Sequence, residues 1–80
     1  MEATELRRIR KALGLNQARF GGLAGVGRQT VSDWECGRGP IPTGAVVLAR
    51  ILSTYPALLP AALAFAGLGQ PAGLVELFTY

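Results

Sequence analysis

The sequence contains no histidine and only one cysteine, Cys36, among its 80 residues. A lone cysteine excludes an intramolecular disulfide and a cysteine-rich metal site, and the lack of histidine excludes histidine-ligated zinc and histidine-based catalysis. The residues that remain do not assemble into a catalytic constellation. We therefore expect that the protein is not an enzyme and that it uses no metal and no cofactor.

Long apolar runs are also scarce. The stretch 57–69 is the most apolar part of the chain, but it contains Pro60 and is too short to span a membrane. The N-terminus is charged and lacks the apolar run of a signal peptide. These features predict a cytoplasmic protein without a membrane partner.

Charge is unevenly distributed along the chain. The formal net charge is +3, and from Ile51 onward the only charged residue is Glu76. A basic N-terminal part suits binding to phosphate, whereas an uncharged apolar end suits burial, either internally or against a second subunit. The cations all precede Ile51: Arg7, Arg8, Arg10, Lys11, Arg19, Arg28, Arg38 and Arg50.

Strand patterning is scarce, and half of the residues are apolar, which excludes disorder. We expect an all-α fold, a compact bundle of five helices at residues 4–13, 17–24, 28–36, 43–54 and 57–66. Residues 1–66 would form one domain, and residues 67–80 an apolar extension that serves in dimerisation. Residues 74–80 (LVELFTY) fit a short strand or a helix, because periodicity alone does not decide between them.

The first predicted helix carries a charged residue on its inner face. Thr4 is a suitable N-cap for this helix, and Gly14 ends it. Arg10 lies beside Leu6 and Leu13 on the apolar stripe. A guanidinium in that position needs a carboxylate partner, and Glu35 is the best candidate.

The stretch 14–37 predicts two short helices joined by a tight turn. Asn16 would cap the first of them, and Gly25 can adopt the positive φ that an abrupt turn requires. Gly21 and Gly22 each cost the helix about 1 kcal/mol relative to alanine. Close packing of the next helix explains Gly21 but leaves Gly22 unexplained. Gly27 stands where serine or threonine would be a stronger N-cap.

The helix predicted at residues 28–36 has two unlike sides. Val31 and Trp34 share the apolar side. A polar face held rigid by a buried aromatic is what reading base edges in a DNA groove requires. Asp33 could accept a hydrogen bond from a cytosine amino group, or it could pair with Arg28 or Gln29. The residues of the polar side are Arg28, Gln29, Ser32 and Asp33.

The helix predicted at residues 43–54 has a broad apolar stripe, and Pro56 ends it. Pro60 in the following helix is tolerable only if it falls in the first turn. The residues expected to face the core are Val47, Leu48, Ile51, Leu52 and Tyr55.

Residues 6–42, LRRIRKALGLNQARFGGLAGVGRQTVSDWECGRGPIP, resemble the phage-repressor type of helix-turn-helix domain, the Cro, lambda-repressor and xenobiotic-response-element type. The Trp34-Glu35 pair followed by Gly37 is part of this resemblance. The family's domains are five-helix bundles that usually bind operator DNA as homodimers. The positions that match the motif core are Phe20, Gly21, Gly25, Val26, Val31 and Trp34.

The resemblance also implies roles for individual residues. Arg28 and Gln29 would reach base edges, while Ser32 and Asp33 would meet the next bases or support the first pair. Gln17 would touch a phosphate and buttress the first residue of the recognition helix. Arg10 would bridge to Glu35, in agreement with the stripe argument. The phosphate-binding and supporting residues would be Asn16, Gln17, Thr30 and Arg38.

Two functions remain open at this stage. The first is a small homodimeric repressor or autorepressor that binds double-stranded DNA at an inverted-repeat operator and acts by occupying a promoter. The second is an antitoxin whose apolar C-terminal part binds a protein toxin. The sequence does not distinguish a phage repressor from a regulator of another mobile-element operon. A membrane-surface role has almost no support, since the basic first helix lacks a large aromatic face.

Overall fold

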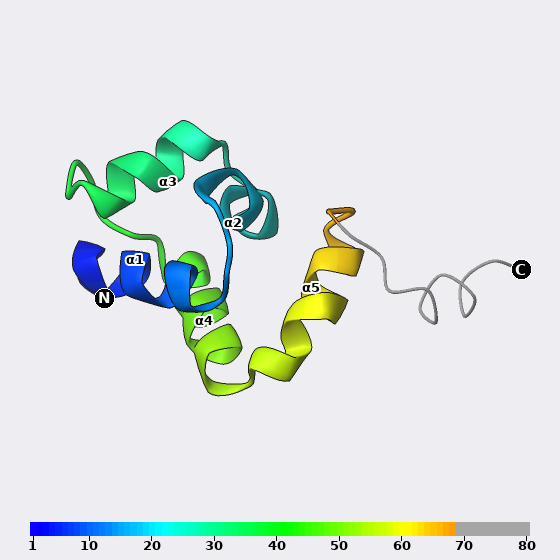
Figure 1. Cartoon of the computed structure of the whole chain (residues 1–80). Helices are drawn as coiled ribbons and strands as arrows, with labels where there is room; N and C mark the ends of the chain where they lie inside the picture. The colour runs from blue at the N-terminus through cyan, green and yellow to red at the C-terminus, as the bar shows by residue number, and fades with distance from the viewer. Residues whose placement is uncertain (69–80) are drawn as a thin grey trace, which may run out of the picture.

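The computed structural model describes residues 1–68, which form helices joined by short loops (Figure 1). The prediction of an all-α, five-helix fold is confirmed for these residues. The expectation of a strand or helix at residues 74–80 lies outside them, as do residues 69–80 of the extension predicted to serve in dimerisation. The elements are α1 (Ala3–Ala12), α2 (Gln17–Ala24), α3 (Arg28–Glu35), α4 (Thr43–Thr54), a 3₁₀ helix η1 (Pro56–Leu58) and α5 (Leu59–Phe65).

Two predicted helix starts differ from the structure. Helix α1 begins at Ala3, one residue early, and its N-cap is Glu2, whose side chain makes no capping bond, so Thr4 is not the cap. The last helix begins as the 3₁₀ turn η1, and α5 follows from Leu59. This arrangement places Pro60 in the first turn of α5, where a missing N–H costs no helical hydrogen bond.

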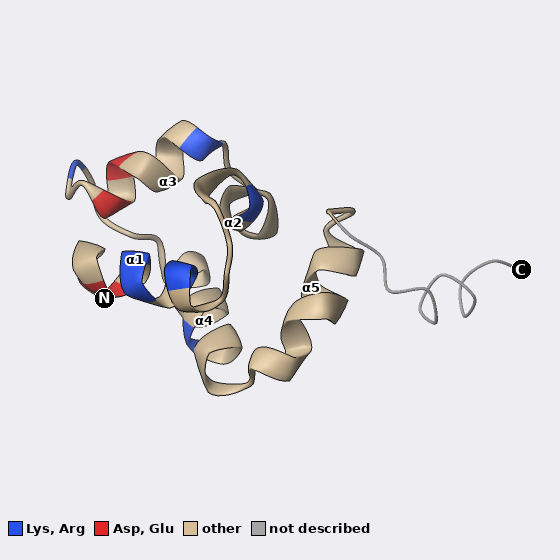
Figure 2. Ribbon diagram, in the orientation of Figure 1, with Lys and Arg blue, Asp and Glu red and all other residues tan. Residues whose placement is uncertain are grey.

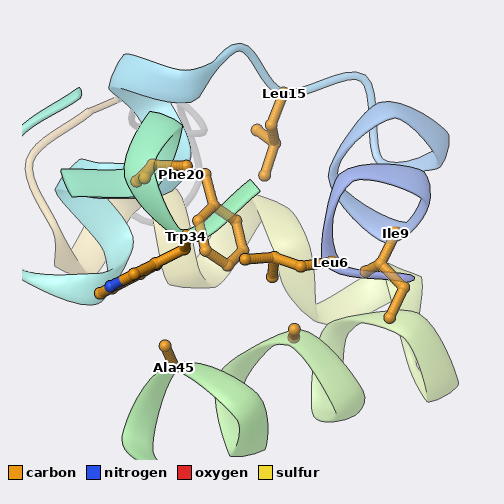
Figure 3. Packing of buried hydrophobic residues seen from close by; sticks show 8 residues of the cluster. Leu6, Ile9, Leu15, Phe20, Trp34 and Ala45 are labelled. Atoms are coloured by element: carbon orange, nitrogen blue, oxygen red, sulfur yellow. The ribbon is translucent and has the colours of Figure 1, made fainter. Parts of the chain in front are cut away.

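The core lies where α1, α2, α3 and α4 meet. Leu6, Phe20 and Val31 have no exposed surface, and Trp34 is 6% exposed. The side chains of Leu6, Phe20 and Trp34 point toward one another between the helices, with Ala45 of α4 below them (Figure 3). Burial of each large side chain stabilises the fold by about 1.5–3 kcal/mol. The core therefore joins α2 and α3, which carry the predicted DNA-reading motif, to α1 and α4.

Helix α4 faces the core with two alanines and Leu52, so the predicted stripe is confirmed at Leu52 and corrected at its most exposed positions. Ala45, Ala49 and Leu52 are buried, whereas Val47 and Ile51 are 48% and 45% exposed. Tyr55 is also exposed, at 62%, and Leu48 is half-buried. The alanine methyl groups let α4 pack closely against α1 and α2, and this register turns Val47 and Ile51 outward.

Helix α5 leaves the end of α4 at a sharp bend, and its far end lies toward α2 (Figure 1). Leu59 and Leu63 of α5 are partly buried against the core. Leu68, just beyond α5, reaches Gly22 of α2, where an added Cβ would lie 2.6 Å from the Leu68 Cδ1 atom. This contact supplies the packing reason for Gly22 that the sequence did not provide.

Candidate nucleic-acid interface

The turn between α2 and α3 is built from glycines that allow close backbone approach. A Cβ added to Gly21 would lie 2.7 Å from the carbonyl oxygen of Val26, so the position admits no side chain. Gly25 ends α2 with φ +77°, a left-handed conformation. Val26 donates its N–H to the Gly21 carbonyl at 2.8 Å, and its side chain packs against the core. These contacts set the direction in which α3 leaves the turn.

The two short helices begin differently. Asn16 Oδ1 accepts the backbone N–H of Arg19 at 2.8 Å, which caps α2 as the sequence predicted. Helix α3 begins after Gly27, which has no side chain to cap it. The first N–H groups of α3 consequently have no side-chain partner at the N-cap, and helix N-terminal N–H groups suit an anion such as phosphate.

The C-terminal end of α3 is tied to α1 by a buried ion pair. Arg10 donates from Nε to Glu35 Oε2 at 2.6 Å and from Nη2 to Oε1 at 2.9 Å. Its third nitrogen donates to the carbonyl oxygen of Leu15 at 2.8 Å. The two charged side chains are only 9% and 4% exposed. The structure therefore confirms that Arg10, on the apolar stripe of α1, pairs with Glu35.

Gln17 completes this network rather than supporting the first residue of α3. Its Nε2 donates to Glu35 Oε1 at 3.2 Å, which places the amide at the C-terminal end of α3, whereas Arg28 lies at the other end. The expectation that Gln17 buttresses the start of the recognition helix is therefore corrected. A buried carboxylate has acceptor sites to fill beyond those that one guanidinium uses, and Gln17 fills one of them.

The network shifts the ionisation of both partners. Burial alone would raise the pKa of Glu35, but hydrogen bonds from Arg10 and Gln17 and the positive charge of Arg10 outweigh it, so the pKa lies below its usual value. The hydrogen bond from Arg10 to Glu35 raises the pKa of the guanidinium above its usual value against the opposing effect of burial. Both groups stay charged at neutral pH, and each stabilises the other.

The opposite side of α3 faces away from the core. Arg28 and Gln29 are exposed, and Ser32 and Asp33 are half-buried, as is Thr30. Burial of Val31 and Trp34 on the inner side fixes this orientation. The structure therefore places all four predicted base-reading residues on the outer part of one helix, with that helix at the edge of the bundle (Figure 1).

Asp33 links two of the predicted DNA-binding residues. Its Oδ1 accepts from Gln29 Nε2 at 3.1 Å and from Arg38 Nη1 at 3.2 Å. The first contact is one of the alternatives that the sequence left open. The second was not anticipated, because it depends on the left-handed turn at Gly37, which has φ +74° and brings Arg38 back toward the helix.

Leu15 is a site-supporting residue that the sequence reasoning missed. Its side chain is 5% exposed, and its carbonyl holds Arg10. A signal was available, because Leu15 precedes the N-cap Asn16 and Phe20 lies four residues after that cap. This is the spacing of a hydrophobic staple.

Exposed cationic side chains are spread over the N-terminal part of the fold. In Figure 2 the charged residues lie on α1, α2, α3, α4 and the loop after α3, while α5 carries none. Arg50 lies apart on α4, 3.8 Å from Glu5. The exposed cations of the first three helices and the following loop are Arg7, Arg8, Lys11, Arg19, Arg28 and Arg38.

A second surface is apolar. We call the exposed side chains of Val47, Ile51, Tyr55 and Leu58 the α4 apolar surface; they are 45–62% exposed. An open depression of about 520 Å³ adjoins it, lined by residues 54–58 with almost entirely apolar atoms.

Residues 1–68 contain no group of three or more acidic or cysteine side chains placed to hold a metal ion. Among the same residues, no single helix is long and apolar enough to cross a membrane. Only α4 taken with residues 56–65 meets the requirements of length and composition, as a pair bent by 109°.

Comparison with known proteins assigns the chain to a family. The family model described as a helix-turn-helix domain matches residues 3–64, which include all five α-helices but for the last residue of α5. No curated protein and no solved structure matches the chain.

Proposed function

Because the chain belongs to the helix-turn-helix domain family, we propose that it is a sequence-specific transcriptional regulator of the phage-repressor type, with α3 as its recognition helix. The observation that carries the proposal is the two-sided character of α3. Val31 and Trp34 lock one side into the core, while the other side presents polar groups to solvent. A rigid helix of this kind fits the major groove.

The reading residues follow from their positions on α3. Arg28 and Gln29 lie in the first turn, are exposed, and carry the side chains that pair with guanine and adenine edges. Ser32 and Asp33 lie one turn later, where they contact the next bases or support the first pair. Arg28 makes no hydrogen bond or ion pair with another described residue, so it is free to reach a base.

The phosphate contacts would come from groups at the edges of α3. Thr30 is half-buried beside the reading face, and Arg38 uses only one of its five N–H donors on Asp33. Asn16 and Gln17 lie at the start of α2, and each retains an amide N–H for a phosphate. Such contacts set the register of the protein on DNA without reading sequence.

The α4 apolar surface supports a homodimer. A second copy would remove Val47, Ile51, Tyr55 and Leu58 from water. A two-fold dimer predicts an inverted-repeat operator with half-sites about one helical turn, or about 34 Å, apart. We propose a cytoplasmic repressor that acts by covering a promoter, and no enzymatic activity.

The alternative is an antitoxin whose apolar C-terminal part binds a protein toxin. No feature of residues 1–68 favours a toxin over a second copy. Size-exclusion chromatography of the purified protein separates the two ideas. A stable dimer supports the repressor, whereas a protein that is monomeric or aggregates supports the antitoxin, which lacks its partner in this experiment.

Selection of bound duplexes from random DNA tests the proposal. We expect a palindromic sequence to emerge. Arg28→Ala should remove the base preference at the position that Arg28 reads, at a cost of about 1–3 kcal/mol, and leave the fold intact. Arg8→Ala is the matched control, since Arg8 is an exposed arginine that lines a shallow pocket with residues of α4, away from α3. An unchanged base preference in Arg28→Ala would overturn the assignment of α3.

A further inference from the structure

The contacts of Asp33 organise the middle of the recognition helix. Gln29 and Asp33 are one helical turn apart, a spacing at which side chains meet, and the Gln29 Nε2 to Asp33 Oδ1 distance is 3.1 Å. Arg38 approaches the same oxygen at 3.2 Å from the loop after α3. One carboxylate thus joins a predicted base reader to a predicted phosphate contact.

The contact with Asp33 constrains what Gln29 offers to DNA. A carboxylate only accepts hydrogen bonds, so the amide must turn its NH₂ group, and not its oxygen, toward Asp33. One N–H is used in this contact, and the second N–H and Oε1 remain free side by side. A neighbouring donor and acceptor form the pattern that pairs with N7 and the amino group of adenine in the major groove. Without Asp33 the exposed amide could rotate.

Arg38 offsets the negative charge that Asp33 would otherwise present to DNA. A bare negative charge near DNA phosphates is repelled, and Arg38 offsets it. The pair is solvent-exposed, with side chains 66% and 40% accessible, and exposed ion pairs contribute little to stability. Loss of the Asp33 carboxylate should therefore leave the fold intact and show its effect in DNA recognition.

We infer that Asp33 is a positioning residue, which orients Gln29 to read an adenine in each half-site and is itself held and neutralised by Arg38. The inference rests on the proposed function, since it assigns a base to one reader of the recognition helix. It also decides between the roles open to Asp33: the carboxylate acts through Gln29 and not by accepting from a cytosine.

Affinity measurements on single-base variants test the inference. The probes are the duplex that the wild-type protein selects from random DNA and the duplexes that differ from it at one base pair, titrated by fluorescence anisotropy at fixed salt. Gln29→Ala should lose a preference for adenine at one position per half-site, by about 5- to 150-fold. Asp33→Ala should reduce the same preference by about threefold or more. This value lies at the lower end of the interaction energies measured between residues in contact.

Two further variants separate positioning from other roles. Asp33→Asn keeps an acceptor oxygen and should retain the adenine preference, while its affinity for unrelated DNA rises because a negative charge is lost. Adding Asp33→Ala to Gln29→Ala should not lower the preference further. Glu2→Gln, which removes an exposed acid at the start of α1, is the charge control and should leave the preference unchanged.

Three results would overturn the inference. An adenine preference that survives Asp33→Ala shows that Gln29 needs no support. If Asp33→Ala instead loses a preference for cytosine at another position, both in the wild type and in Gln29→Ala, then Asp33 reads a base directly. A wild-type protein that selects no sequence refutes the proposed function itself, and that failure is visible before any variant is made.

Discussion

Removal of Glu35 should destabilise the protein far more than removal of the whole ion pair. Glu35→Ala deletes the carboxylate that accepts two hydrogen bonds from Arg10 and one from Gln17. The Arg10 side chain, only 9% exposed in the intact protein, would be left without its counter-ion. Breaking a buried pair on one side costs about 3–5 kcal/mol. A domain of this length has a total stability of about 4–12 kcal/mol, so the loss is a large share of it.

The matched variant replaces both charges at once. Arg10→Met with Glu35→Leu fills the same space with apolar side chains and leaves no charge buried. Replacements of this kind are often neutral or stabilising, so the double variant should lie within about 1 kcal/mol of the wild type. Only the carbonyl of Leu15 and the amide of Gln17 lose a partner, and Gln17 is half-buried, so water can reach it.

Urea unfolding followed by tryptophan fluorescence measures both effects. Trp34 is the only tryptophan of the chain, is 6% exposed, and precedes Glu35, so its emission reports unfolding of this region. We expect a lower midpoint for Glu35→Ala at an unchanged slope, and a midpoint near the wild type for the double variant. If Glu35→Ala costs less than about 1 kcal/mol, or the double variant costs the sum of the two single ones, the pair does not hold a buried charge as the geometry indicates.

Urea unfolding tests two further expectations, and sedimentation velocity tests a third. The pKa of Glu35 is lowered in the folded state, so its stabilisation is present above pH 4.5, its usual value, and lost as the pH falls through the folded pKa; Glu35→Gln should show a weaker loss of stability in acid. Gly21→Ala should destabilise the protein, because its Cβ would lie 2.7 Å from a backbone carbonyl oxygen. Gly22→Ala should be near neutral, because its Cβ meets only the end of a flexible leucine side chain and alanine gains about 1 kcal/mol of helix propensity. Ile51→Glu should lower the apparent mass in sedimentation velocity with the melting temperature kept, while Ser53→Glu, an exposed neighbour on the same helix, should not; a dimer that persists in Ile51→Glu places the interface elsewhere.

The sequence predicted the contact between Arg10 and Glu35 because a buried guanidinium has few possible partners in this chain. A guanidinium on an apolar stripe must find a carboxylate, and the chain offers only five acidic residues. The orientation of α4 was not predictable in the same way. Hydrophobicity favours turning Ile51 and Val47 inward, but close packing of helices selects the small residues Ala45 and Ala49. That selection depends on the helices that α4 meets, and the sequence of α4 does not contain this information.

Contacts between residues far apart in the sequence also limited what could be predicted of the candidate site. Gly22 had no local explanation, because the side chain that approaches it belongs to Leu68, beyond α5. The Arg38 contact with Asp33 likewise depends on a turn whose path follows from the backbone at Gly37. The resemblance to phage repressors placed Gln17 at the correct helix start, but its hydrogen bond goes to the buried carboxylate of Glu35.

The proposed recognition helix α3 is held at both ends, although the turn that precedes it contains Gly25 and Gly27. At the N-terminal end, Gly21 and the Val26 carbonyl are in close backbone contact, which leaves no room for the turn to shift. At the C-terminal end, Glu35 is bonded to Arg10 of α1 and Gln17 of α2. Rotation of α3 about its own axis would break the second set of contacts, and tilting it would break the first. Freedom to adapt to different bases must therefore come from the exposed side chains of α3, whose positions depend on contacts such as that between Gln29 and Asp33.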